Sequence, residues 1–274
     1  MAYRYLLESG QPDGYLLEDS SGVLSLDGDA PLSPRLITTV ETAWNTSADK
    51  TTASFAVLKG DILVAWMSDE GYDTGSGNTS QALGIANTGS LSAWNQEQLV
   101  QVNLYCQMAM WTATATADGN VTVTFSHAGA SIQHTGGRVW VFRDSDGVGA
   151  SAKTNVASGA PSLAITTNRD NSALCVGDAD FLVASGYARA WRTGSGELVE
   201  NTFQEDTGHY TVYGGHHRHA GLAGSNTVGL TAPGGQKYSI IAVEVYGRPG
   251  TVTTQFVEPG RRTQPGIRRR IEFA

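Results

Sequence analysis

The sequence predicts an all-β protein, built as an antiparallel β-sandwich or jelly-roll-like domain with an extended arm at each end. Its 274 residues include 33 glycines and only 16% charged residues, while hydrophobic residues make up 40%. Abundant glycine together with small β-favouring residues is typical of a sheet-rich chain with many turns. No stretch of about a dozen residues keeps the 3.6-residue period of an amphipathic helix, so any helix is expected to be short.

The N-terminal arm, residues 1–35, repeats a short apolar run three times. Tyr5-Leu6-Leu7-Glu8 and Tyr15-Leu16-Leu17-Glu18 are nearly identical, and Val23–Asp27 is a looser copy. Such short strands gain stability only by joining a sheet, either their own or that of a neighbouring molecule. One interpretation is a small meander packed on its own domain; the other is exchange with neighbouring copies. The second predicts interface residues at Tyr5, Leu6, Leu7, Tyr15, Leu16 and Leu17.

Residues 36–247 are expected to form the β-sandwich domain, with about a dozen strands separated by turn residues. Strict alternation on both sides of Asp118-Gly119 predicts a two-residue hairpin that joins strands 111–117 and 120–126. The same alternation predicts that Val121, Val123 and Phe125 face the core. The best helix candidate is LSAWNQEQLV, residues 91–100.

The C-terminal arm, residues 248–274, is basic, whereas the rest of the chain is acidic. It carries six arginines against two glutamates, a charge of +4, and the remainder carries −12. A basic arm and an acidic body favour association between copies of the chain. The candidate interface arginines are Arg261, Arg262, Arg268, Arg269 and Arg270. Because no aromatic residues are interleaved with them, we do not expect nucleic acid as the main partner.

The chain is expected to be soluble and made in the cytoplasm. It has no apolar run long enough to span a bilayer and no signal segment at its start, so no membrane partner is expected. Cys106 and Cys175 lie in apolar strand-like runs, which favours reduced core residues over a disulfide.

A histidine-rich segment, GHYTVYGGHHRHA, raises the possibility of a metal site. His217 and His219 are two residues apart, so on an extended strand their imidazoles share a face. However, only Glu205 and Asp206 lie near them in sequence as further ligands. The alternative interpretation is a polar loop or ordinary interface histidines, and we expect no cofactor.

No catalytic motif is present, and we do not expect an enzyme. The chain has no GxSxG nucleophile elbow, and its carboxylates are scattered over predicted loops. The long, regular strand repeats of a glycan-degrading tailspike are also absent.

Tryptophans divide into two groups. Trp66, Trp111 and Trp140 lie inside strand runs and are expected in the core, whereas Trp94 and Trp191 have polar neighbours. The latter pair is therefore the candidate glycan-stacking surface, although an exposed tryptophan beside Arg192 would equally suit a protein interface.

Two segments resemble structural proteins of tailed bacteriophages. GYLLEDSSGVLSLD resembles the opening of many such proteins. The succession Gly60-Asp61-Ile62-Leu63-Val64, then Trp111 through Phe125, then Val139-Trp140-Val141-Phe142 resembles a β-sandwich module of minor virion proteins and bacterial surface proteins. The resemblance covers roughly residues 1–27 and 36–247 and concerns a style of protein rather than a named activity.

This resemblance implies a non-enzymatic structural component of a virion, either a capsid-decoration or a tail protein. It would be assembled in the host bacterial cytoplasm, and its partners would be other virion proteins and copies of itself. The alternative function is a carbohydrate-binding adhesin that attaches to a glycan on the host surface.

Overall fold

The computed structural model describes most of the chain between residues 33 and 248 and three short segments before it. The described residues are 4–6, 15–18, 24–26, 33–45, 49–69, 72–73, 78–79, 82–100, 107–128, 135–180, 190–193, 198–205, 211–218, 220–232 and 234–248. The chain divides into two units: residues 32–248 form one, and the terminal segments 1–31 and 249–274 form the other.

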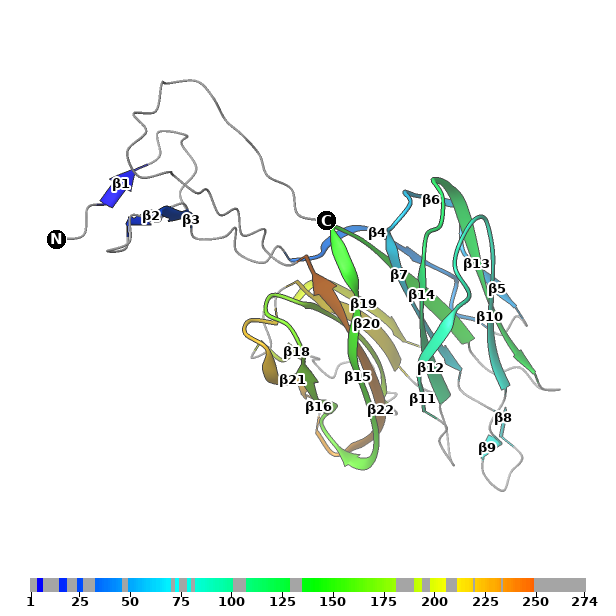
Figure 1. Cartoon of the computed structure of the whole chain (residues 1–274). Helices are drawn as coiled ribbons and strands as arrows, with labels where there is room; N and C mark the ends of the chain where they lie inside the picture. The colour runs from blue at the N-terminus through cyan, green and yellow to red at the C-terminus, as the bar shows by residue number, and fades with distance from the viewer. Residues whose placement is uncertain are drawn as a thin grey trace. The chain divides into compact units, whose positions relative to one another are not determined.

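The repeated runs of the N-terminal arm form strands, as predicted. These are β1 (Arg4–Leu6), β2 (Tyr15–Glu18) and β3 (Leu24–Leu26), and they pair antiparallel in the order β1-β2-β3 (Figure 1). The strands are only three or four residues long, so the sheet offers little surface for a core of its own.

The first half of the 32–248 unit is an antiparallel sandwich. Its five-stranded inner sheet has the order β11 (Asn95–Val100), β12 (Gln107–Thr114), β7 (Ile62–Asp69), β14 (Thr135–Arg143) and β4 (Arg35–Glu41). Its outer sheet contains β10 (Ala82–Thr88), β13 (Gly119–Ala128), β5 (Lys50–Thr51) and β6 (Phe55–Val57). A two-stranded ribbon, β8 (Tyr72–Asp73) and β9 (Asn78–Thr79), lies between β7 and β10 in sequence.

The second half is another antiparallel sandwich. Its inner sheet has the order β15 (Ser145–Gly159), β22 (Gln236–Gly247), β17 (Ala173–Asp180), β20 (Thr211–His217) and β19 (Leu198–Glu205). Its outer sheet has the order β16 (Ser162–Thr167), β21 (Gly224–Ala232) and β18 (Ala190–Trp191). The described residues contain no helix, so the predicted all-β class is confirmed.

The two sandwiches repeat one topology. Each sandwich has eight main strands, which we number 1 to 8 in chain order. In the first sandwich these are β4, β6, β7, β10, β11, β12, β13 and β14, and in the second they are β15 through β22. In both, the inner order is 5-6-3-8-1 and the outer order is 4-7-2. In each sandwich, strand 1 therefore pairs with strand 8, strand 2 with strand 7, and strand 3 with strand 6. This is the arrangement of a long hairpin rolled into a jelly roll. The predicted domain 36–247 thus lies within the unit 32–248, and its strands are arranged as two sandwiches instead of one.

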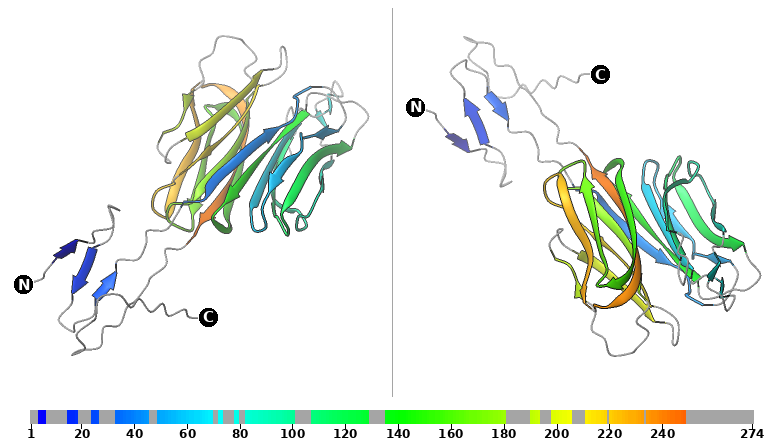
Figure 2. Two further views of the ribbon diagram at one scale, coloured as in Figure 1. Left: turned by 90° about the horizontal axis from the view of Figure 1, so that it is seen from above. Right: turned by 90° about the horizontal axis from the view of Figure 1, so that it is seen from below.

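The two inner sheets pack face to face, which produces four layers (Figure 2). β11 lies against β15, β12 against β22 and β7 against β17, so the strand order reverses between the facing sheets. Three hydrophobic cores separate the four layers, one inside each sandwich and one between them. The inner sheets are consequently buried on both faces, which explains why DILVAWM and SALCVG are continuous apolar runs without alternation.

Aromatic side chains of the first sandwich fill the core between the sandwiches. Trp66 is 1% exposed and its ring lies 6.5 Å from that of Trp140. The ring rests on the backbone of Gly177 in the facing sheet, where a Cβ atom would lie only 2.3 Å from it. Arg138 crosses the same interface and donates to the Gly214 carbonyl at 3.1 Å. The predicted core positions of Trp66, Trp111 and Trp140 are confirmed.

The hairpin predicted around Asp118-Gly119 is wrong. β12 pairs with β11 and β7, whereas β13 pairs with β10, β5 and β6, so the turn joins strands of two different sheets. Asp118 lacks the positive φ of a type I′ turn, and its carboxylate accepts from the Lys59 amide at 2.7 Å. The predicted inward face of β13 is confirmed, because Val121, Val123 and Phe125 are at most 1% exposed.

The helix candidate at 91–100 is also wrong. Residues Asn95–Val100 form edge strand β11, which pairs with β12. Leu99 packs on the core of the first sandwich, and Val100 is 4% exposed in the core between the sandwiches. Pairing with β12 therefore outweighs the weak local helix preference of this segment.

Tyr238 makes the stability of the second sandwich sensitive to alkaline pH. Its side chain is buried and its hydroxyl donates to the Ser162 carbonyl across the two sheets. Burial raises the pKa of Tyr238 above the ordinary value of 10.0. In the unfolded chain this tyrosine therefore ionises first, and stability falls as pH rises through about 10. We expect Tyr238→Phe to lose less unfolding free energy than the wild type between about pH 9 and about pH 11, as measured by urea unfolding at both pH values. An equal loss in the two proteins would contradict this expectation.

Candidate functional site

The predicted arm residues are only partly described. Tyr5 and Leu6 lie in β1, and Tyr15, Leu16 and Leu17 lie in β2, where Tyr5 pairs with Leu16. Leu7 and the five candidate arginines (Arg261, Arg262, Arg268, Arg269 and Arg270) lie outside the described residues. The interface prediction for these positions therefore remains a prediction.

The two candidate glycan-binding tryptophans lie on different sandwiches. Trp94 packs against the core of the first sandwich and its indole nitrogen donates to Asn87 Oδ1 at 2.9 Å. Trp191 packs against the core of the second, with its ring edge-on to Tyr213 at 5.6 Å. They occupy corresponding places in the repeat, near the connection from strand 4 to strand 5. The two rings therefore belong to separate sandwiches, and glycan binding at either one stays a prediction.

Only one of the two candidate metal ligands is described, so this site stays a prediction. His217 is fully buried in β20, and His219 lies outside the described part of the chain. Within that part, no group of three or more histidine, cysteine, aspartate or glutamate side chains has the arrangement of a metal site. Cys175 is buried in the core, as predicted, and Cys106 is not described.

One end of the double sandwich brings together the chain's entry, its exit and the link between the two sandwiches. The link is Asp144, which adopts a positive φ of 58° between β14 and β15. Arg35, the first residue of β4, donates to the Asp144 carboxylate at 3.2 Å. Arg248, which follows β22, places its guanidinium 3.9 Å from the same carboxylate. We call these three residues the junction.

The strand pairing around the junction shows why these points converge. Arg143, at the end of β14, pairs with Arg35 at the start of β4. Ser145, at the start of β15, pairs with Gly247 at the end of β22. The junction charges are at least one-third exposed, so their ion pairs contribute little to stability. The junction marks the place from which both terminal segments leave the double sandwich.

A buried carboxylate stabilises the turn of the first sandwich beside the junction. Arg143 donates two hydrogen bonds to Asp61, at 2.8 and 2.7 Å, and Asp61 also accepts from the Leu58 amide. Asp61 is 1% exposed, and its hydrogen bond raises the pKa of Arg143 above its ordinary value. Arg143 at the end of β14 (strand 8) therefore holds the turn between β6 and β7 (strands 2 and 3) in place.

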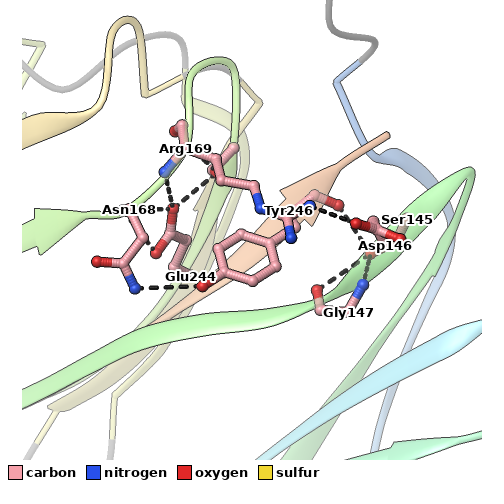
Figure 3. Close-up of polar contacts among 8 residues, drawn as sticks. Ser145, Asp146, Gly147, Asn168, Arg169, Glu244 and Tyr246 are labelled. Atoms are coloured by element: carbon pink, nitrogen blue, oxygen red, sulfur yellow. Dashed lines mark hydrogen bonds and ion pairs between the residues drawn. The ribbon is translucent and has the colours of Figure 1, made fainter. Parts of the chain in front are cut away.

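In the second sandwich the corresponding turn is held by a carboxylate on strand 8, so the acceptor and the donors have exchanged places (Figure 3). Glu244, on β22, is fully buried and accepts from the backbone amides of Ala150, Asn168 and Arg169 at 2.8–3.2 Å. The Ser172 hydroxyl donates to it at 2.7 Å. Four donors thus surround one carboxylate, which compensates for its removal from water.

Above this carboxylate, Arg169 forms the outer layer of the same cluster. Its guanidinium lies 4.1 Å from the Tyr246 ring centre and pairs with Asp146 (Figure 3). The hydrogen bond to Asp146 raises the pKa of Arg169. Asn168 donates to the Tyr246 hydroxyl at 3.2 Å. These contacts therefore connect the turn after β16 with β15 and β22, next to the junction.

Sequence reasoning did not identify the junction or the Glu244 cluster. One signal was present, because Glu244 interrupts the apolar run SIIAVEVYG. A carboxylate inside such a run requires buried donors, but the sequence does not reveal that they come from β15 and the turn after β16.

Among the described residues, no helix has the length and apolar character needed to cross a membrane. Comparisons with protein-family models, with curated proteins and with solved structures found no match.

Proposed function

We propose that the protein is a non-enzymatic structural component of a phage particle, in the capsid-decoration or tail class. The double sandwich acts as a stiff body, and its terminal segments attach it to other virion proteins or to copies of itself. The observation that carries this proposal is the junction, because Arg35 and Arg248 meet at Asp144. Both terminal segments start from one end of the body.

Several features support a rigid body. The inner sheets are buried on both faces, and the turns beside the junction are each held by a buried carboxylate. The resemblance of the N-terminal run to phage structural proteins supports the virion setting. Repeating a modest contact over a lattice provides avidity without a large interface for each copy.

Truncation tests the role of the terminal segments. We expect the full chain to associate in solution, and removal of 1–32 or 249–274 to lower the mass measured by light scattering. The deletions leave β4 and β22 intact, so loss of association would not reflect loss of the body. A matched variant replaces Arg261, Arg262, Arg268, Arg269 and Arg270 with glutamine at unchanged length. A full chain that is monomeric and insensitive to every change would refute the proposal.

Glycan binding separates the adhesin alternative from the structural role. Binding on a glycan array that is lost in Trp191→Ala but kept in Trp94→Ala would support an adhesin whose site lies on the second sandwich. Normal association with no glycan binding would support the structural proposal.

A further inference from the structure

A lysine is buried in the outer sheet of the first sandwich. Lys50 lies in β5 and pairs with Phe125 of β13, whose side chain faces the core. Lys50 itself is only 3% exposed. Burial lowers the pKa of this amine from its ordinary value of 10.5. A larger share of the amine is therefore neutral, and the neutral form is the nucleophile.

An asparagine carboxamide lies against this amine. Asn45 forms a bridge with Thr135 of β14, through backbone hydrogen bonds of 3.2 and 3.1 Å. The Lys50 amine contacts the side-chain oxygen of Asn45. Asn45 is thus held beside the inner sheet while Lys50 is held in the outer sheet, and the two backbones keep the reacting groups together. Asn45 is exposed, so a leaving group would have access to solvent.

We propose that Lys50 and Asn45 form an intramolecular isopeptide bond. The neutral Lys50 nitrogen attacks Asn45 Cγ, the new N–C bond forms, and the bond from Cγ to the carboxamide nitrogen breaks. One proton moves from the lysine nitrogen to the departing nitrogen, which leaves as ammonia. The step requires no oxidant, metal or co-reactant, and it covalently joins the inner and outer sheets of the first sandwich.

Two further ionisable side chains, Asp69 and His127, lie on the strands that neighbour this pair. Asp69 pairs with Thr135, the strand neighbour of Asn45, and is 1% exposed. His127 Nδ1 lies 3.2 Å from Asp69 Oδ2, and Gln107 donates to the same oxygen at 3.1 Å. Both Asp69 and His127 are therefore positioned inside the sandwich rather than at its surface.

Mass spectrometry of the tryptic digest of the full chain tests the proposal. Modified lysine resists trypsin, so the linked protein should yield one peptide spanning residues 36–59, with a mass lower than its sequence mass by one ammonia. The unlinked protein should yield separate peptides 36–50 and 51–59. Recovery of the two separate peptides at full mass from folded protein would overturn the proposal.

Three variants assign the bond to these side chains. Asn45→Ala should restore cleavage after Lys50, and Lys50→Arg should show no loss of ammonia. Asn45→Asp should reach the wild-type product mass, because condensation with a carboxyl releases water instead. Asp69→Asn should slow formation of the linked peptide if Asp69 carries the proton. The peptide masses do not depend on association between copies of the chain. Failure of the bond proposal would therefore leave the proposed virion role untouched, and the reverse also holds.

Discussion

Replacing Trp66 with alanine is expected to lower the free energy of unfolding by about 3–5 kcal/mol. The side chain is 1% exposed, stacks near Trp140 and Trp44, and rests on Gly177 of the facing sheet. Truncation leaves a large cavity between the two inner sheets, and strands buried on both faces have no means of closing it. Urea unfolding followed by far-ultraviolet circular dichroism measures the change.

The position of Trp66 also predicts a change in cooperativity. Because it fills the core shared by the two sandwiches, the wild-type chain should unfold in one transition, and Trp66→Ala should separate it into two. Trp94→Ala is the matched control, since this half-buried ring lies outside the shared core and should cost only about 1–2 kcal/mol. Equal losses for the two variants would contradict the central role of the shared core.

Replacing Glu244 with leucine is expected to cost about 3–5 kcal/mol, even though the side-chain volume is nearly kept. The change leaves the amides of Ala150, Asn168 and Arg169 and the hydroxyl of Ser172 without their acceptor in a buried site. Unpaired buried donors cost more than the hydrogen bonds contribute on average. Thermal unfolding and hydrogen exchange of the turn after β16 measure the effect.

Glu244→Gln is the matched control for this prediction. Glutamine keeps one acceptor oxygen and the length of the side chain, so the expected loss is smaller, about 1–2 kcal/mol. Because the cluster lies beside the junction, Glu244→Leu should also increase hydrogen exchange near Ser145 and Gly247. An unperturbed junction would show that the turn and the junction are energetically separate.

The inward face of β13 shows what local pattern predicts well. Alternation over 120–126 correctly assigned Val121, Val123 and Phe125 to the core, because side chains on a strand point to opposite faces in turn. The pairing partner of the same strand was predicted incorrectly. A tight turn of Asp and Gly serves both a hairpin and a corner between sheets, so only the remaining strands decide which one forms.

Duplication of the sandwich was equally hidden in the sequence. Strand 3 reads ILVAWMSD in the first copy and ALCVGDAD in the second, and Trp66 occupies the place that Gly177 takes in its counterpart. Each sandwich needs a different surface there, because the large ring of one must rest on the bare backbone of the other. The two sandwiches therefore share a topology although their packing requires different side chains at this position.

The sequence by itself determined the all-β class, the strands of the N-terminal arm and the buried tryptophans, because composition and alternation act over a few neighbouring residues. Only the tertiary structure decided which sheet each strand joins, that two sandwiches share a core, and that Asp144, Glu244 and the Lys50–Asn45 pair find their partners. Apart from the Lys50–Asn45 contact, whose residues are only five positions apart, these contacts join residues that are distant in sequence, and a short window of sequence does not show which distant donor or strand edge a residue meets.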